Sequence, residues 1–201
     1  MTIIKVLAAA GTILAAGAGA RIAGAADFNI EPGGKNFVRF ESKAPMETVT
    51  GTTQQVHGSL AFDPASLGDT IAVTVAVDLA TLDTGIALRN RHMRENHLHT
   101  DKYPQAVFHG ARILESSAPG LGQGKTTKLR VRGILAMHGV EKVVEAPVEA
   151  DLLPDGSVHA LVRFDVKLAD YEIPRPQFLV MRLDEVQHLT LDLTARPGAA
   201  P

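Results

Sequence analysis

Apolar and polar residues alternate along most of this chain, and this alternation restricts it to strands that bury one face. The pattern is clearest at residues 158–168, where apolar residues occupy every even position and His159, Arg163 and Lys167 lie between them. Residues 71–78 and 144–152 repeat it. A period of two places successive side chains on opposite faces of a strand, and one solvated face is typical of antiparallel sheets. The sequence therefore predicts an all-β protein.

Further strands are predicted by short apolar segments between turn sequences. The turns include Asp63-Pro64, Pro119-Gly120 and His138-Gly139. About eight strands with short connections predict a meander that closes on itself. Besides the three segments above, the predicted strands are residues 36–43, 48–62, 105–114, 127–137 and 186–194.

Two segments interrupt the alternation. Residues 80–100 are rich in charge and histidine, and we expect a crossover with one or two helical turns there. Residues 168–181 contain Pro174 and Pro176, which remove backbone donors and predict a loop or an irregular edge strand.

The first 25 residues have the pattern of a signal peptide. Lys5 precedes an apolar stretch at residues 6–20, and Ala23-Gly24-Ala25 offers a cleavage site. The apolar stretch is shorter than the ~20 residues that a membrane-spanning helix needs. We expect residues 26–201 to form one exported domain, located in the periplasm or secreted. A buried N-terminal helix is the alternative.

Composition excludes several classes of function. The chain has no cysteine, which excludes thiol catalysis and a lipidated N-terminal cysteine. Its formal charge is -2, without the basic footprint of a nucleic-acid-binding protein. It has no tryptophan and two tyrosines, too few for stacked bases or for the aromatic girdles of an outer-membrane barrel. We expect no nucleic-acid partner and no membrane-spanning segment.

Several short motifs occur together in a specific order. Residues 58–64 (GSLAFDP) lead into an Asp-Pro turn, and residues 131–140 (VRGILAMHGV) form a predicted hairpin. Together with the motifs between them, they resemble the YceI-like family over roughly the whole of residues 26–201. The motifs between are Thr84-Gly85, Arg89, Met93, Leu98, Lys102-Tyr103-Pro104 and Phe108.

The resemblance implies both a fold and a function. The implied fold is an elongated, lipocalin-like, eight-stranded antiparallel barrel with a short helical crossover. The implied function is that of a non-catalytic carrier or buffer for an isoprenoid or other lipid-like molecule, such as a polyprenyl phosphate or a quinone. This chain departs from the family in having Asn90 where an aspartate is usual, and in its additional His97 and His99.

The apolar face of the strands supplies candidate ligand-binding residues. An eight-stranded barrel is wide enough to hold one slender ligand or to fill itself with side chains, so a self-filled core is the alternative. Burial contributes ~0.8 kcal/mol per methylene, which suits a long hydrocarbon chain. The predicted cavity residues are Phe40, Phe62, Val75, Met93, Leu98, Phe108, Leu135, Met137, Val162 and Phe164.

Arg89, Arg91 and Arg94 are candidates for binding an anionic head group, because guanidinium groups match phosphate oxygens. The alternative is a solvated face on which these arginines pair with Glu95 and Asp101.

Three histidines, His92, His97 and His99, lie close together in the crossover. Their spacing is looser than that of tight zinc motifs, so we expect a solvated polar segment with no metal and no cofactor. The chain has no Gly-x-Ser-x-Gly motif and no paired carboxylates at motif spacing. A hydrolase or isomerase acting on an apolar substrate around residues 89–101 is the alternative function. The sequence leaves open whether the protein is a monomer or a homodimer.

Overall fold

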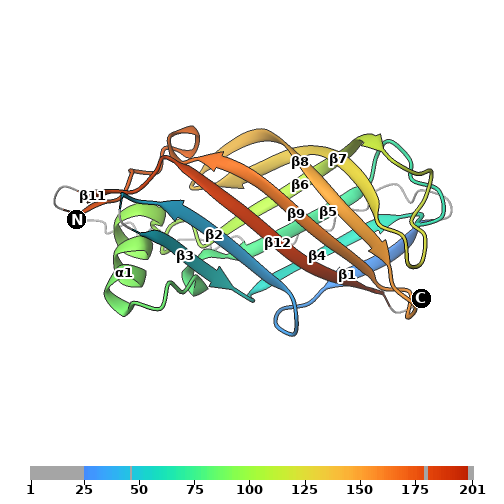
Figure 1. Ribbon diagram of the computed structural model, residues 1–201, viewed down its shortest axis with the longest axis horizontal. Coiled ribbons are helices and arrows are strands. Elements are labelled where there is room, and N and C mark those ends of the chain that lie inside the picture. The colour runs from blue at the N-terminus through green and yellow to red at the C-terminus, as the bar shows by residue number, and fades with distance from the viewer. Residues whose placement is uncertain (1–24, 46, 179–180, 199–201) are drawn as a thin grey trace, which may run out of the picture.

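Eight antiparallel strands close into an elongated barrel (Figure 1). The computed structural model describes residues 25–45, 47–178 and 181–198. Each strand pairs with the next around the barrel, and β1 closes it by pairing with β12 at Phe28 and Asn29. The predicted all-β, eight-stranded antiparallel barrel is thereby confirmed. In their order around the barrel the strands are β1 (Ala26–Ile30), β4 (Val56–Phe62), β5 (Ala72–Asp78), β6 (Gln105–Ser116), β7 (Thr127–Met137), β8 (Val140–Leu152), β9 (Val158–Lys167) and β12 (Val186–Pro197).

A hairpin of β2 (Phe37–Lys43) and β3 (Thr48–Thr53) lengthens one side of the barrel. β2 pairs with β12 along His188 to Asp192, beyond the part of β12 that pairs with β1. The predicted strand at residues 48–62 is therefore two strands, β3 and β4. It breaks at Gln54 and Gln55, because their carbonyl groups accept hydrogen bonds from Gly33 and Asp78.

The segments that interrupt the alternation contain helical turns and a small hairpin. The crossover consists of the 3-10 helix η1 (Leu79–Thr81), the helix α1 (Ala87–His92) and the π-helical turn η2 (Met93–Leu98), as predicted for residues 80–100. A second 3-10 helix, η3 (Leu168–Tyr171), follows β9. The hairpin of β10 (Gln177–Phe178) and β11 (Met181–Arg182) lies where we predicted a loop or irregular edge.

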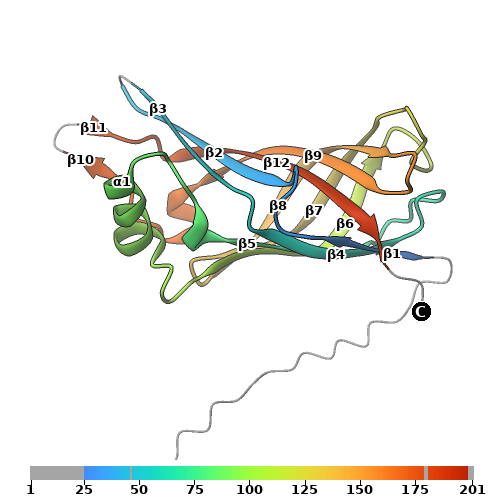
Figure 2. The ribbon, with the colours of Figure 1, turned by 90° about the horizontal axis from the view of Figure 1, so that it is seen from below.

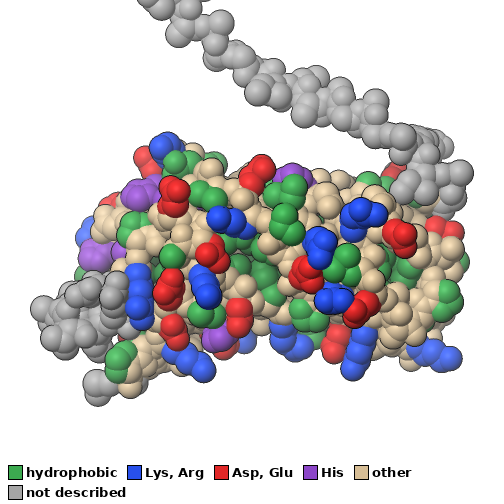
Figure 3. Space-filling model, turned by 90° about the horizontal axis from the view of Figure 1, so that it is seen from above, with side chains coloured by type: hydrophobic (Ala, Val, Ile, Leu, Met, Phe, Trp, Pro, Cys, Tyr) green, Lys and Arg blue, Asp and Glu red, His purple; other side chains and the backbone are tan. Residues whose placement is uncertain are grey.

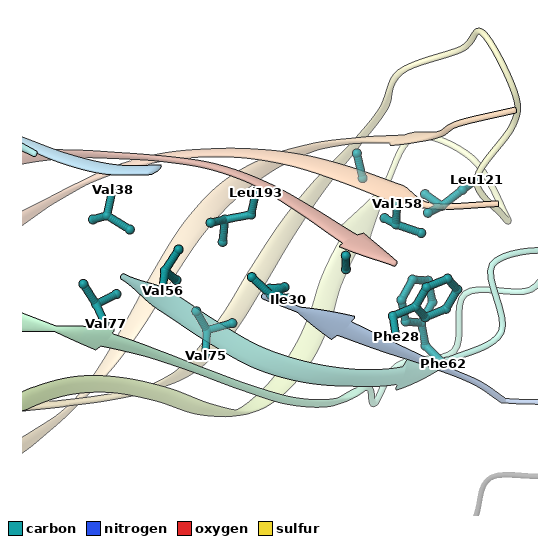
Figure 4. Packing of buried hydrophobic residues seen from close by; sticks show 12 residues of the cluster. Phe28, Ile30, Val38, Val56, Phe62, Val75, Val77, Leu121, Val158 and Leu193 are labelled. Carbon is teal, nitrogen blue, oxygen red and sulfur yellow. The ribbon is translucent and has the colours of Figure 1, made fainter. Parts of the chain in front are cut away.

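The two ends of the barrel differ. At the helical end, α1 and the β2–β3 hairpin lie beyond the closed ring of strands (Figure 2). At the closed end, the rings of Phe28 and Phe62 stack with 5.2 Å between centroids, close to Leu121 (Figure 4). Two loops join over this end through hydrogen bonds from Leu67 N to Pro119 O, 2.7 Å, and from Leu121 N to Pro64 O, 2.6 Å. Phe28, Phe62 and Leu121 belong to the buried apolar core of the barrel, so the core extends as far as the contacts that close this end.

Charged side chains of both signs are interspersed over the face of the molecule that Figure 3 shows. Arg130 and Arg132 of β7 both pair with Glu145 of β8, for example. Cross-strand pairs of this kind are typical of a solvated face. The alternate, apolar residues of each strand then face inward.

Candidate functional site

A cavity of about 660 Å³ runs inside the barrel. Its wall is almost wholly apolar, and every strand of the closed ring contributes to it. Strand β9 shows how the sequence builds this wall, because each of its even-numbered residues and Leu168 line the cavity. The volume lies within the ~300–1,000 Å³ range of sites that take small molecules. The barrel is therefore hollow, and the alternative of a core filled by its own side chains does not hold.

Every cavity residue predicted from the sequence lines this cavity. Met93 and Leu98 reach it from the crossover, and the others reach it from the strands. Their contact with a ligand stays a prediction. The prediction was incomplete, since β12 carries the same alternation and also contributes Leu189, Leu191 and Leu193. The alternation of these three leucines with polar residues along residues 188–194 is the sequence signal that assigns them to the cavity face.

A bulge in β6 changes which residues face the cavity. Ala106 and Phe108 line the wall, but beyond the bulge the lining residues are Ala111 and Ile113. Gly110 supplies the extra residue with a φ of 67°, a left-handed conformation that glycine adopts without steric cost. Strict alternation along β6 would therefore have assigned its second half to the wrong face.

Two phenyl rings lie over glycines of neighbouring strands. A Cβ atom on Gly51 would be 2.2 Å from Cε1 of Phe40, and one on Gly133 would be 2.3 Å from Cζ of Phe108. Each ring therefore occupies the space that a side chain of the neighbouring strand would take. Because glycine has no side chain, each ring can lie flat against the barrel wall. With a larger residue in place of the glycine, the ring would project further into the lumen.

Among the described residues, the polar groups that line the cavity lie toward its helical end. They come from the β2–β3 hairpin, the crossover and the beginning of β12, whereas Phe62, Leu121 and Val158 line the closed end. The cavity therefore suits an elongated molecule that is apolar along its length and polar at one end. The polar lining residues are Glu47, Thr84, Arg89, His92, His97 and Gln187.

Arg89 is the one candidate head-group arginine that lines the cavity, and it already has partners. Its Nε donates to Thr84 Oγ1 and its Nη2 to Thr84 O, both at 3.0 Å. Its Nη1 lies 3.6 Å from a carboxylate oxygen of Glu47. Arg91 is exposed and Arg94 is half-buried, both outside the lining. The alternative pairing with Glu95 and Asp101 does not hold for Arg89, which pairs with Glu47 because the β2–β3 hairpin reaches the crossover.

Asn90 fixes the turn that precedes α1. Its Oδ1 accepts hydrogen bonds from Thr84 N at 2.8 Å and Thr84 Oγ1 at 2.6 Å, and its Nδ2 donates to Asp83 Oδ1 at 2.6 Å. Hydrogen bonds from Gly85 N and from Asn90 lower the pKa of Asp83 below its usual value. Next to an ionised Asp83, position 90 requires a donor and an acceptor, which an amide supplies and a carboxylate does not.

We expect Asn90→Asp to lower the urea midpoint of unfolding at neutral pH, because it replaces a hydrogen bond with two carboxylates in contact. The loss should shrink as the pH falls through ~4 and the carboxylates become protonated. Urea unfolding at several pH values measures the loss of stability and its dependence on pH. Asn96→Asp is the matched control, since Asn96 is exposed. Equal stability of the two variants at neutral pH would contradict this role of Asn90.

The crossover histidines join elements of the helical end. His97 Nδ1 donates to Pro174 O at 2.9 Å, and burial lowers the pKa of His97 below its usual value. His99 Nδ1 lies 2.9 Å from His138 Nε2, and His138 Nδ1 donates to Tyr171 O at 3.0 Å. His97 and His99 are thus half-buried connectors, which differs from the solvated segment that we expected. The sequence could not show this, because their partners are distant in the chain.

No group of three or more histidine, aspartate or glutamate side chains converges as a metal site in the described residues. His92 lies exposed at the cavity rim, while His97 and His99 bond to different partners. We therefore expect the melting temperature to be the same with and without a chelator. A large decrease on chelation would contradict this expectation.

The sequence model of the YceI-like domain matches residues 28–195. A UPF0312 protein of Vibrio campbellii is 30% identical over 162 residues, which are 76% of this chain and 80% of that protein. No helix in the described residues is long and apolar enough to cross a membrane.

Two solved structures share the fold. Burkholderia cenocepacia BcnA superposes with a TM-score of 0.66 at 19% identity, covering 80% of this chain and 96% of BcnA. A polyisoprenoid binding domain from Saccharophagus degradans superposes with a TM-score of 0.64 at 18% identity, covering 85% of this chain and 98% of that domain.

Proposed function

This chain belongs to the YceI-like family, and we propose that it is a carrier or buffer that holds one long isoprenoid-like lipid in the barrel cavity without transforming it. The observation that carries the proposal is the form of the cavity: about 660 Å³, apolar along the barrel, sealed at one end and polar at the other. A related fold, that of the Saccharophagus degradans domain, is described as polyisoprenoid binding, which supports this ligand class.

The energetics favour a long hydrocarbon chain. Each buried methylene contributes ~0.8 kcal/mol, or roughly a fourfold gain in affinity, without any directional contact. We expect the ligand to enter tail first, because Phe28, Phe62 and Leu121 close the far end. Its polar end would then lie among the polar lining residues of the helical end.

The contacts of Arg89 bear on the head group. Its guanidinium is held by Thr84, and Glu47 balances its charge. A phosphate at this position would approach the Glu47 carboxylate, which disfavours a doubly charged head group. The arrangement therefore favours an uncharged head group, such as a quinone ring, over a polyprenyl phosphate.

Calorimetric titration with quinones and polyprenyl phosphates of increasing chain length tests the proposal. Affinity should rise with each added isoprene unit until the cavity is full and then level off, since further units remain in water. Affinity that does not depend on chain length would contradict a tail-binding cavity. Recovery of a chemically altered ligand would instead support the hydrolase or isomerase alternative.

Export is part of the proposed function, and it rests on the signal-peptide pattern of residues 1–25. Residues 1–24 lie outside the described residues. We expect cleavage close to Ala25, which leaves β1 intact because β1 begins at Ala26. N-terminal sequencing of the folded protein from the periplasmic or secreted fraction identifies the cleavage position. An intact Met1 on that protein would contradict export by cleavage.

A further inference from the structure

The rim of the cavity at the helical end exposes two large apolar side chains. Ile86 and Leu88 are 51% and 54% exposed, and both also line the cavity. Among the described residues, Val143 is the one other large apolar side chain that is exposed, and it lies on the outer face of β8. The apolar surface of the cavity therefore continues onto the outside of the molecule at this rim.

Positive charge accompanies these apolar side chains. Residues 86–94 contain Arg89, Arg91 and Arg94 and no acidic residue, in a chain whose formal charge is -2. Leu88 and Arg91 are three residues apart in α1, so they share a face of the helix, and both are exposed. Arg89 pairs with Glu47, while Arg91 has no ion pair within the part of the chain that the structure describes.

We propose that this rim docks reversibly on the surface of an anionic lipid bilayer, so that the ligand passes between bilayer and cavity. Ile86 and Leu88 would enter the boundary between head groups and acyl chains, and Arg91 would face lipid phosphates. The inference rests on the proposed function, because it concerns a lipid ligand.

The position of the rim explains why a bilayer fits it better than another partner. A long apolar molecule is poorly soluble in water, so a path through water is slow. The rim lies on α1, at the end of the barrel that is not sealed by Phe28 and Phe62 (Figure 2). A bilayer against it would place the source of the ligand at the mouth of the cavity. Two apolar side chains give weak docking, which suits a carrier that must leave again.

Flotation with vesicles tests the inference. The probe is vesicles of equal parts phosphatidylglycerol and phosphatidylcholine, compared with pure phosphatidylcholine. We expect the protein to float with the anionic vesicles and more weakly with the zwitterionic ones. The double variant Ile86→Ser/Leu88→Ser should lower binding by about tenfold or more. Val143→Ser is the matched control, because it removes an exposed apolar side chain of β8 that does not line the cavity, and its binding should equal that of the parent.

Three outcomes would overturn the inference. The first is that the parent protein binds no vesicles, and the second is that the double variant binds vesicles as well as Val143→Ser does. In the third, size-exclusion chromatography shows a parent dimer that the double variant converts to a monomer, which would make the rim an interface between two copies. The titration with free ligand is run on the same parent protein. If it shows chain-length-dependent affinity while vesicle binding is absent, the docking inference fails and the proposed function stands.

Discussion

Replacing Phe164 with aspartate is expected to unfold the protein or to abolish ligand binding. Phe164 lies on β9, faces the cavity and packs with Leu135 and Leu189 in an apolar cluster. A carboxylate there loses its hydration and finds no partner in the apolar wall, which costs about 3–5 kcal/mol. That is a large share of the roughly 5–15 kcal/mol by which domains are stable.

The neighbouring residue on the same strand provides the control for Phe164→Asp. Arg163 is exposed on the outer face, so Arg163→Asp introduces the same carboxylate one residue away and leaves the cavity unchanged. Urea unfolding of both variants, followed by ligand titration of whichever folds, measures the difference. Similar losses of stability in the two variants would show that β9 does not separate an apolar inside from a solvated outside.

Val162→Trp should keep the fold and lose the ligand. Val162 faces the cavity between Val148 and Leu191 on the neighbouring strands, and the lumen has room for a larger side chain. Overpacking a filled core costs ~1–3 kcal/mol, and less where an open cavity accepts the added ring. The indole would therefore occupy part of the volume that the lipid needs while leaving the wall apolar.

Lys167→Ala is the control for Val162→Trp, because Lys167 is exposed at the end of β9. Thermal melts report stability, and solvent extraction of the purified variants reports bound lipid. We expect Val162→Trp to melt near the parent with its lipid lost, and Lys167→Ala to change neither. A strong loss of stability in Val162→Trp with lipid retained would contradict an open lumen at this position.

The sequence predicted the strands that bury one face over several residues, but it did not predict how the barrel closes. The alternation in β5, β8 and β9 involves only sequence neighbours, so the sequence predicts which side of the sheet each side chain faces. Strand β1 has only five residues and follows directly on the signal-like segment, so its role in closing the barrel against β12 was missed. The break between β3 and β4 depends on hydrogen bonds to Gly33 and Asp78, which lie elsewhere in the chain.

The candidate site was predictable where it depends on the strand period and not where it depends on distant contacts. The inward position of Phe108 and Phe164 followed from alternation, and the structure places both on the wall. That Phe108 lies over Gly133 depends on the pairing of β6 with β7. The partner of Arg89 is Glu47, forty-two positions away, and only the folded β2–β3 hairpin brings the two together.

Native mass spectrometry of freshly purified protein, followed by solvent extraction of the same sample, tests directly whether the barrel holds a lipid. We expect a bound species of one lipid per chain, which organic solvent releases as a long isoprenoid-like molecule. Prior extraction, or the Val162→Trp substitution, should remove this species. The contradicting result is a parent protein that carries no extractable lipid and gains no mass when quinones or polyprenyl phosphates are added.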